Sequence, residues 1–434
     1  MSLYGALLTG VSGLSAQSQA LATTSSNIAN VDTVGYKSSD TAFATVLAST
    51  MPGGSSAAGV TAKAVQNVTQ SGILQSASSP TDLAISGSGF FVTAQSLSNT
   101  SNLFYTQAGD FSPDSNGNLV NSEGYYLLGY PVTTNGNVTT TGNTLSPVNV
   151  SALGGRAEPT TSVALQANLQ STSTVDSSYV AGDMANGTVA PDFTRTVNVY
   201  DSQGGSQPLT FSFIETGANT WAYEVGYAGN SSNITGGNPI SSGTLTFNTD
   251  GTLANVNGAS PASGNLSFTI PWSASSGLAS QAVTVNMGTV GSSNGVTQFD
   301  SASTLTAATP NGASVGTLTG VSVDTNGNVT AQYSNGLSSV IFQVPVATFA
   351  NADGLSAVSG TAYQSSNASG AALLNTAGTG AAGTIKSSEL EDSTVDINKE
   401  FSSLITTQNA YSAAARIITT ADQMLQTLSQ IPTQ

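Results

Sequence analysis

Apolar residues recur every seven positions at both ends of this chain, and this repetition is the feature that most restricts its fold. Heptad spacing lines up apolar side chains on one side of a helix and is typical of helices that pack on other helices. The N-terminal series is Leu7, Leu14, Leu21 and Ile28, and the C-terminal series is Ile397, Leu404, Tyr411, Ile418 and Leu425, with Phe401 at the companion position. Because no helical pattern lies between the two series, we expect the terminal helices to pack on each other or on other copies of the chain.

The start of one helix and the weakness of the other can also be predicted. Ser393 followed by Asp396 resembles a capping box, which predicts that the C-terminal helix begins there. Gly5, Gly10 and Gly13 each cost the N-terminal helix about 1 kcal/mol relative to Ala. We therefore hypothesise that the termini become helical when copies assemble, because burial in the assembly offsets the cost of ordering them.

Between residues 70 and 385 the pattern is that of β-strands and turns. The dipeptides at 116–117, 250–251 and 326–327 are Asn-Gly or Asp-Gly between short apolar runs, which predicts three β-hairpins. The surrounding Asp and Asn residues lack the Gly and Glu spacing of an EF-hand, so turn chemistry is favoured over calcium binding. No helical pattern follows the Gly-x-Gly at Gly87 and Gly89, so a β-bulge is favoured over a nucleotide-binding loop.

Apolar residues alternate with polar ones at 209–213 and again at 221–225, which predicts a hairpin with one buried aromatic face. Glu215 and Glu224 flank its turn, and we expect both carboxylates on the solvated face. An acid pair beside Trp221 would also suit a glycan-cleaving enzyme. Two solvated carboxylates on a hairpin are the favoured interpretation.

The inventory of side chains excludes several functional classes. The 434 residues include 7 Lys and Arg, 23 Asp and Glu, and neither Cys nor His, for a net charge of −16. The absence of thiols and imidazoles removes thiol nucleophiles, the usual neutral-pH base and the commonest metal ligand, so any catalysis would have to come from carboxylates, Tyr or Lys. We expect no catalytic residue, cofactor or metal site. Nucleic acid is excluded as a partner, because neutralising phosphates needs clustered cations. No window approaches the roughly 18 apolar residues of a membrane span, so we expect no membrane insertion, and the N-terminus is not an ordinary secretory signal.

These patterns predict a mainly β chain with terminal α-helices and nested domains. The paired terminal helices would occupy 1–30 and 390–434 as a coiled-coil-like layer. A linker segment at 31–71, loop-like at 49–59, would follow the first helix. The inner β domain is predicted at 72–155 and 297–389, with an outer β domain, 156–296, inserted into it.

Several segments resemble the family of bacterial flagellar rod, hook and hook-associated proteins. The resemblance is carried at the N-terminus by 7–37, where Asn30, Gly35, Tyr36 and Lys37 match the family signature. It continues, in the right order, through 82–93, 104–130, 158–170, 199–204, 344–355 and 389–428. Ser26 and Asp32 depart from the family, which usually has Asn at both positions. A single inserted domain of about 140 residues resembles the hook members most, whereas rod proteins lack a sizeable insert.

The resemblance implies a structural subunit, not an enzyme, that polymerises with itself into the flagellar hook. The hook is a curved, bendable tube that acts as a universal joint between rod and filament. The terminal helices would line the tube, and the β domains would form its outer layers. Other implied partners are the rod, the hook-associated junction proteins, the hook cap and the type III export apparatus. Export without a cleaved signal would place the protein outside the cell, in the flagellum. A distal rod or hook-associated protein and a secreted β-rich adhesin are the alternatives.

The residues expected to mediate assembly follow from the heptads and from the signature. They are Leu7, Leu14, Leu21, Ile28, Asn30, Gly35, Tyr36, Lys37, Ile397, Phe401, Leu404, Tyr411, Ile418 and Leu425. We expect Gly35 to let the backbone reverse after the first helix and Tyr36 to act as a packing anchor. Lys37, a rare cation, would face the acidic surface of a neighbouring subunit.

Overall fold

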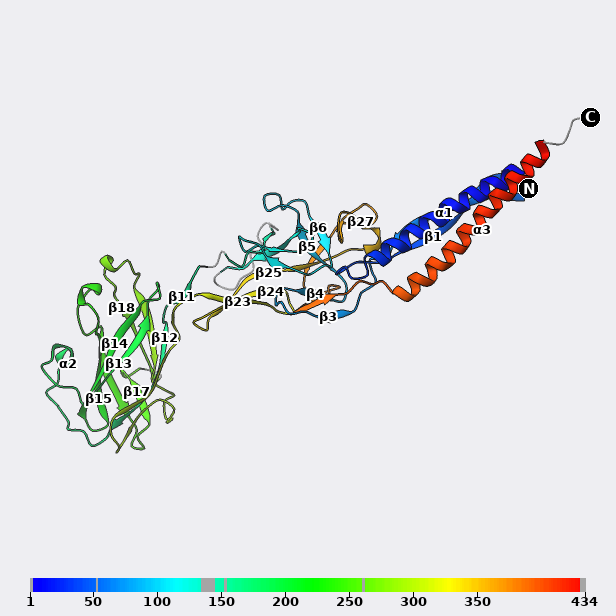
Figure 1. The fold of residues 1–434 in the computed structure, drawn as a ribbon. Helices are drawn as coiled ribbons and strands as arrows, with labels where there is room; N and C mark the ends of the chain where they lie inside the picture. Colours follow the sequence, from blue (N-terminus) through cyan, green and yellow to red (C-terminus); the bar gives the residue numbers. More distant parts are fainter. Residues whose placement is uncertain (1–2, 52–53, 134–144, 152–153, 260–261, 430–434) are drawn as a thin grey trace, which may run out of the picture. The chain divides into compact units, whose positions relative to one another are not determined.

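A computed structural model describes residues 3–51, 54–133, 145–151, 154–259 and 262–429 of the chain. It divides into two compact units, and the chain passes from the first to the second and back again. Unit 1 comprises Met1–Ala152, Gly320–Ala331 and Ser338–Gln434, and unit 2 comprises Leu153–Thr319 and Gln332–Leu337. The fold is mainly β with a helix at each end, as predicted (Figure 1). No helix in the described ranges is both long and apolar enough to cross a membrane.

The two long helices of unit 1 lie side by side, with the chain termini at the same end of the pair (Figure 1). They are α1 (Leu3–Ala29) and α3 (Ile397–Ser429). Small residues of α1 make the closest approach, since a Cβ atom at Gly10 would lie 3.0 Å from Ile418 Cγ1. Ala16 and Ala20 of α1 are also buried. The glycine that weakens the isolated helix therefore lets the two backbones come close together.

The predicted linker contains a β-hairpin. Strands β1 (Ser39–Met51) and β2 (Gly54–Gln66) pair antiparallel, and both strands pack against α1. The Val60 amide donates a 3.3 Å hydrogen bond to Ser12 Oγ of the helix. The prediction of a loop at 49–59 was therefore wrong for 49–51 and 54–59. A Gly/Ser-rich composition indicates weak strand propensity, but long-range pairing and the surface of α1 override it.

The β part of unit 1 is built from segments on both sides of the insertion. Strand β4 pairs with β30, β3 with β31, and β5 with β26, so the N-terminal and C-terminal halves close one structure. Its strands are β3 (Leu74–Ser76), β4 (Leu83–Ser86), β5 (Phe90–Ala94), β6 (Phe104–Thr106), β7 (Ser112–Pro113), β8 (Leu119–Val120), β9 (Tyr126–Pro131), β10 (Ser146–Pro147), β23 (Leu318–Val323), β24 (Asn328–Tyr333), β25 (Ser338–Gln343), β26 (Pro345–Thr348), β27 (Ser356–Ala357), β28 (Ala362–Gln364), β29 (Leu373–Thr376), β30 (Thr384–Ser387) and β31 (Glu389–Glu391).

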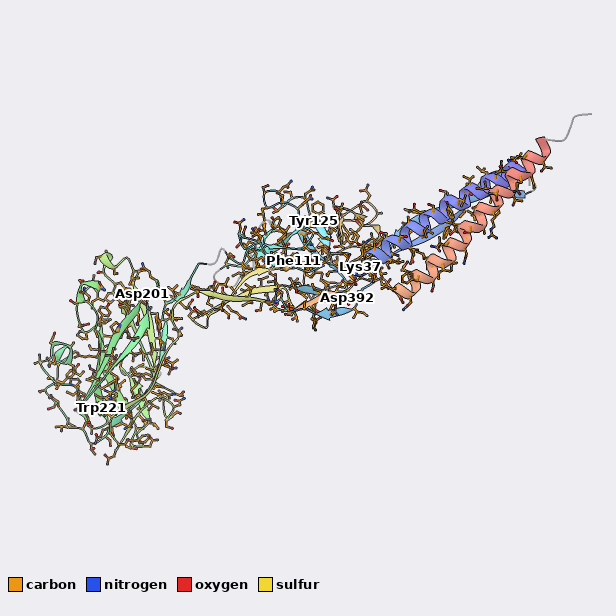
Figure 2. The ribbon with its side chains drawn as sticks, viewed as in Figure 1. Lys37, Phe111, Tyr125, Asp201, Trp221 and Asp392 are labelled. Atoms are coloured by element: carbon orange, nitrogen blue, oxygen red, sulfur yellow. The ribbon has the colours of Figure 1, made fainter. Side chains whose placement is uncertain are left out.

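Unit 2 is a sandwich of two five-stranded sheets around one apolar core. The first sheet is β18-β19-β12-β20 with β21 also on β12, and the second is β13-β14-β15-β16-β17. Its elements are β11 (Arg156–Glu158), β12 (Ser162–Gln170), α2 (Asp183–Asn186), β13 (Phe193–Tyr200), β14 (Ser206–Gly217), β15 (Thr220–Tyr227), β16 (Ser241–Phe247), β17 (Leu253–Val256), β18 (Asn265–Ile270), β19 (Gln281–Asn286), β20 (Val296–Phe299), β21 (Thr304–Pro310) and β22 (Ala313–Gly316). Buried side chains of β12, β14 and β15, including Trp221 (labelled in Figure 2), belong to this core.

The second boundary of the insert differs from the predicted one. We predicted its end at 296, but β20, β21 and β22 belong to unit 2. Strand β21 pairs with β12 across Val163–Asn168, and β22 pairs with β11. The strands that close the sandwich therefore come after the predicted end, and no change in composition marks this point.

The predicted turns are present. The Asn-Gly turn at 116–117 joins the paired strands β7 and β8, and the Asp-Gly turn at 250–251 joins β16 and β17. The Asp114 carboxylate accepts bonds from the amides of Asn116 and Asn118, so its oxygens are occupied within the turn. At Gly87 and Gly89 the chain has positive φ and passes from β4 to β5, which pair with different strands. The Gly-x-Gly is therefore a break between two strands, and the predicted bulge was wrong.

The predicted hairpin of β14 and β15 is present, but its two glutamates are not solvated. Glu215 is 3% exposed and Glu224 is 2% exposed. Glu215 pairs with Trp221 and shares its buried face, whereas Glu224 pairs with Ser212 and lies on the opposite face. The Glu224 carboxylate accepts bonds from Tyr179 Oη at 2.7 Å and from the amides of Gly182 and Ala185. Because the two acids lie on opposite faces of the sheet, they cannot flank one glycosidic bond.

Candidate assembly site at the base of the helix pair

Three segments of unit 1 meet where α1 ends and α3 begins. They are 27–39, 66–72 and 389–400, and we call this place the basal junction. The residues of the family signature lie here, between the end of α1 and the start of β1. The strand pair β3–β31 brings the C-terminal segment to them.

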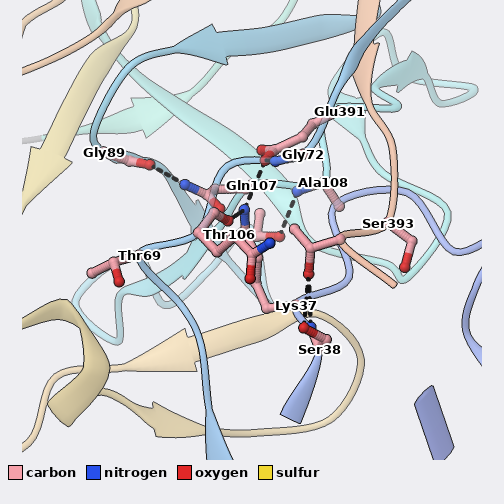
Figure 3. Close-up of polar contacts among 12 residues, drawn as sticks. Lys37, Ser38, Thr69, Gly72, Gly89, Thr106, Gln107, Ala108, Glu391 and Ser393 are labelled. Carbon is pink, nitrogen blue, oxygen red and sulfur yellow. Dashed lines mark hydrogen bonds and ion pairs between the residues drawn. The ribbon is translucent and has the colours of Figure 1, made fainter. Parts of the chain in front are cut away.

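A buried ion pair joins the N-terminal and C-terminal segments of the basal junction. Lys37 Nζ lies 2.7 Å from Glu391 Oε1, and the two side chains are 0% and 2% exposed (Figure 3). Lys37 Nζ also donates to the Gln70 carbonyl at 2.7 Å, and the Gly72 amide donates to Glu391. Burial lowers the pKa of Lys37, and the charge and hydrogen bond of Glu391 oppose this shift. The prediction that Lys37 faces a neighbouring subunit was therefore wrong, because its ammonium is enclosed by its own chain.

Asn27 connects the end of α1 to the starts of β1 and α3. Its Nδ2 donates to the Ser39 carbonyl at 2.8 Å and to Glu400 Oε1 at 3.0 Å. Its Oδ1 accepts from the Ser39 amide at 3.0 Å and from Tyr36 Oη at 3.3 Å. Both ends of the buried amide are thus paired, and three elements are held in one geometry. Tyr36, predicted as a packing anchor, donates one of these hydrogen bonds.

Gly35 allows the backbone to turn toward the β part of unit 1. Its φ is +69°, and a Cβ atom there would lie 2.6 Å from the backbone nitrogen of Ala108. Its amide donates to the Glu391 carbonyl at 2.8 Å. Asn30 stays local, with Nδ2 donating to the Ser26 carbonyl and Oδ1 accepting from Thr33. The expected reversal of the chain at Gly35 therefore depends on a conformation and a close contact that a side chain would disturb.

The C-terminal helix begins at Ile397, four residues after the expected capping serine, Ser393. Asp396 is its N-cap, because its Oδ1 accepts from the Asn398 amide at 2.9 Å and from the Lys399 amide at 3.3 Å. Ser393 lies before the helix, so the predicted capping box was wrong. Lys399 Nζ approaches Asp40 Oδ1 at 3.5 Å in an exposed ion pair.

The predicted heptad residues fall into two groups. Leu7, Leu14, Leu21, Ile28, Leu404 and Ile418 are half-buried, and Ile418 faces Gly10 of α1, whereas Ile397, Phe401, Tyr411 and Leu425 are exposed. Val11, which lies four positions after Leu7, is also exposed. Other exposed apolar side chains of the two helices, which the heptads did not identify, are Leu8, Ile405, Ile417 and Met424. The helix pair therefore leaves apolar surface uncovered on both of its members.

Sequence reasoning missed Asn27, Gln70, Glu391 and Glu400 as partners in the basal junction. Asn27 and Glu400 are 373 residues apart, and Lys37 and Glu391 are 354 residues apart. No local spacing could connect them. The only available signal was the presence of a lysine in a segment that otherwise reads as a turn.

A cavity of about 570 Å³ lies beside the basal junction. Its lining mixes apolar side chains with two carboxylates, those of Asp32 and Asp392 (Figure 2 labels Asp392). Ile73, also in the lining, is 78% exposed. The residues that line it are Val31, Asp32, Thr33, Val34, Ile73, Gln75, Ser76, Ala77, Leu390, Asp392, Ser393 and Val395.

Models of four flagellar domains match the chain in order. Residues 7–37 match the flagella basal body rod protein, and 84–172 match the flagellar hook protein FlgE/F/G D1 domain. Residues 168–313 match the flagellar basal body protein FlaE D2 domain, which extends past 296 as unit 2 does. Residues 386–431 match the flagellar basal body rod FlgEFG protein C-terminal region.

Two relatives that align over nearly their full length carry the same name. The flagellar hook protein FlgE of Caulobacter vibrioides is 32% identical, with 99% of this chain and 100% of the relative aligned. The flagellar hook protein FlgE of Escherichia coli is 33% identical over 96% of this chain and 98% of the relative. The solved flagellar hook protein FlgE2 of Helicobacter pylori covers 73% of this chain and 99% of its own, with 13% identity and a TM-score of 0.45. On the full-length identities, the chain belongs to the family of the flagellar hook protein FlgE.

Proposed function

We propose that this protein is a structural subunit of the bacterial flagellar hook, which polymerises into the bendable tube between rod and filament. The observation that carries the proposal is the uncovered apolar surface of the helix pair. Phe401 is 51% exposed, and Ile405 and Ile417 are similarly open. Burying such side chains in contacts with other copies would stabilise a polymer by roughly 25 cal/mol per Å².

The basal junction would hold the helix pair on the β part of unit 1 within each subunit. Its buried contacts join α1, β1 and α3 to the segment around Gln70. A rigid attachment lets force applied to the outer part of a subunit reach the helices, which a flexible linker would not do. The residues predicted for assembly thus divide into two roles. The exposed apolar side chains would contact other copies, and Gly35, Tyr36 and Lys37 would fix the shape of one copy.

The remaining partners follow from the family. Contacts with the rod, with the hook-associated junction proteins and with the hook cap are proposed for the ends of the polymer. Export through the flagellar type III apparatus and a place outside the cell, in the hook, are part of the same proposal. A subunit that only builds the tube needs no catalytic site, and the separation of Glu215 from Glu224 on opposite sheet faces supports a structural role.

Polymerisation of the purified chain tests the proposal. Concentrated protein should form short curved tubes visible by negative-stain electron microscopy. Phe401→Asp should suppress the tubes, because a charged side chain would have to enter an apolar contact. Gln408→Asp is the matched control, since it adds the same charge at an exposed polar position of the same helix. Wild-type protein that stays monomeric at every concentration, or a control that suppresses tubes equally, would refute the proposal.

A further inference from the structure

The helices carry very few charges, and one of them has no partner within its own chain. Helix α1 has no Asp, Glu, Lys or Arg, and α3 has Lys399, Glu400, Arg416 and Asp422. In the described part of the chain, the Arg416 guanidinium makes no ion pair or hydrogen bond. Asp422 lies six positions later, which does not face Arg416 on a helix, and its carboxylate accepts from Gln426.

The surface of α3 around Arg416 is exposed and uncharged, with Ser412, Ala413, Thr419 and Thr420 three or four positions away. Ile417 is its neighbour in sequence, and Tyr411 lies further back along the helix, both with exposed side chains. If this surface is covered by other copies, the guanidinium loses water and needs a carboxylate partner. Arginine is suited to this, because its planar fork binds a carboxylate through two hydrogen bonds and its stem packs on apolar groups.

The cavity beside the basal junction carries the opposite charge. Asp32 and Asp392 contribute carboxylates to a lining that contains no Lys or Arg. Within the described residues neither carboxylate has an ion pair or a hydrogen bond, so both are available to a cation. The apolar part of the lining, with Ile73 at 78% exposure, provides a surface for the stem of an arginine.

We propose that Arg416 of one subunit enters this cavity in a second copy of the chain and pairs there with Asp32 and Asp392. The inference rests on the proposed function, because it needs copies packed through their helices. Arg416 cannot reach the cavity of its own chain. The cavity lies just before the start of α3, whereas Arg416 is nineteen residues beyond Ile397, or about 28 Å along the helix. If the α3 helices of two paired copies run parallel, this contact displaces one copy from the other by about 28 Å along α3.

Charge reversal and rescue test the pairing. Arg416→Asp should raise the critical concentration for tube formation at least about tenfold, which corresponds to about 1.4 kcal/mol, and Asp392→Arg should act similarly. The double variant, Arg416→Asp with Asp392→Arg, should recover most of the loss, because each contact again joins opposite charges. Lys63→Asp, the same charge change at an exposed lysine of β2, should shift the critical concentration less than about twofold.

Cross-linking provides a second measurement, and it benefits from the absence of cysteine in the chain. A chain with Arg416→Cys and Asp392→Cys should form a ladder of covalent oligomers when tubes are oxidised, whereas each single variant should not. A double charge variant that assembles no better than its worse parent, or a missing ladder in tubes that do form, would overturn the pairing and leave the proposed function standing. Wild-type protein that forms no tubes would overturn both.

Discussion

Removing the lysine of the buried ion pair should unfold unit 1 selectively. In Lys37→Met the Glu391 carboxylate stays buried with the Gly72 amide as its remaining donor, and the Gln70 carbonyl loses its partner. Breaking a buried pair on one side costs about 3–5 kcal/mol, because it leaves an uncompensated charge. For a unit of this size the melting temperature should fall by roughly 6–20 °C. Replacing both partners, as in Lys37→Met with Glu391→Leu, should cost less than the single change.

The chain offers a built-in reporter for this experiment. Its two tryptophans, Trp221 and Trp272, are both in the core of unit 2. Urea unfolding followed by tryptophan fluorescence therefore reports unit 2, while far-UV circular dichroism at the helix minimum reports mainly α1 and α3. Lys37→Met should shift the dichroism transition and leave the fluorescence transition in place. The exposed Lys63→Met is the control. A shift below about 1 kcal/mol in the dichroism transition would show that the pair does not hold the basal junction together.

Two further predictions concern single positions, one in each unit. Gly35→Ala should destabilise unit 1 by at least about 1–3 kcal/mol, because it combines a positive φ with a close contact to the Ala108 backbone; an unchanged dichroism transition would contradict this. Burial, with a smaller contribution from Asp192, raises the pKa of Glu215. Protonated Glu215 is therefore the form that favours the folded state. Its contribution to stability is complete below the unfolded pKa of about 4.3 and is lost as pH rises through the folded pKa. In tryptophan-monitored unfolding, the stability of Glu215→Gln relative to wild type should then increase between pH 4 and pH 7. A stability difference that stays constant over this range would show that the pKa of Glu215 is not raised.

The sequence predicted those elements that depend on residues close together in the chain, namely the terminal helices and the hairpin turns. The terminal helices follow from heptads, and the hairpin turns follow from Asn-Gly and Asp-Gly dipeptides, since both depend on residues a few positions apart. The contact between α1 and α3 includes Gly10, which lies three positions after Leu7 and four before Leu14 and faces Ile418 of the C-terminal heptad. Propensity alone counts this glycine only as a cost.

The candidate site could be predicted only in part. The signature segment was located correctly, but Lys37 was assigned to the surface because its partner lies 354 residues away. The glutamates of the β14–β15 hairpin were placed on a wet face, although Glu215 shares the face of Trp221 and the segment around α2 covers Glu224. In each case the missing information was long-range pairing, which composition and periodicity do not contain.

The interleaved chain order has a consequence for folding. Unit 2 is drawn almost entirely from one continuous stretch, 153–319, so its sandwich can form as soon as that stretch is available. Unit 1 can be completed only later, because β3 and α1 pack against β31 and α3, which lie in about the last tenth of the chain. Closing such long loops before any contact forms is entropically slow. The helix pair, whose exposed apolar surface would drive polymerisation, is thus completed last. A chain that is only partly synthesised therefore lacks the surface that would bind other copies.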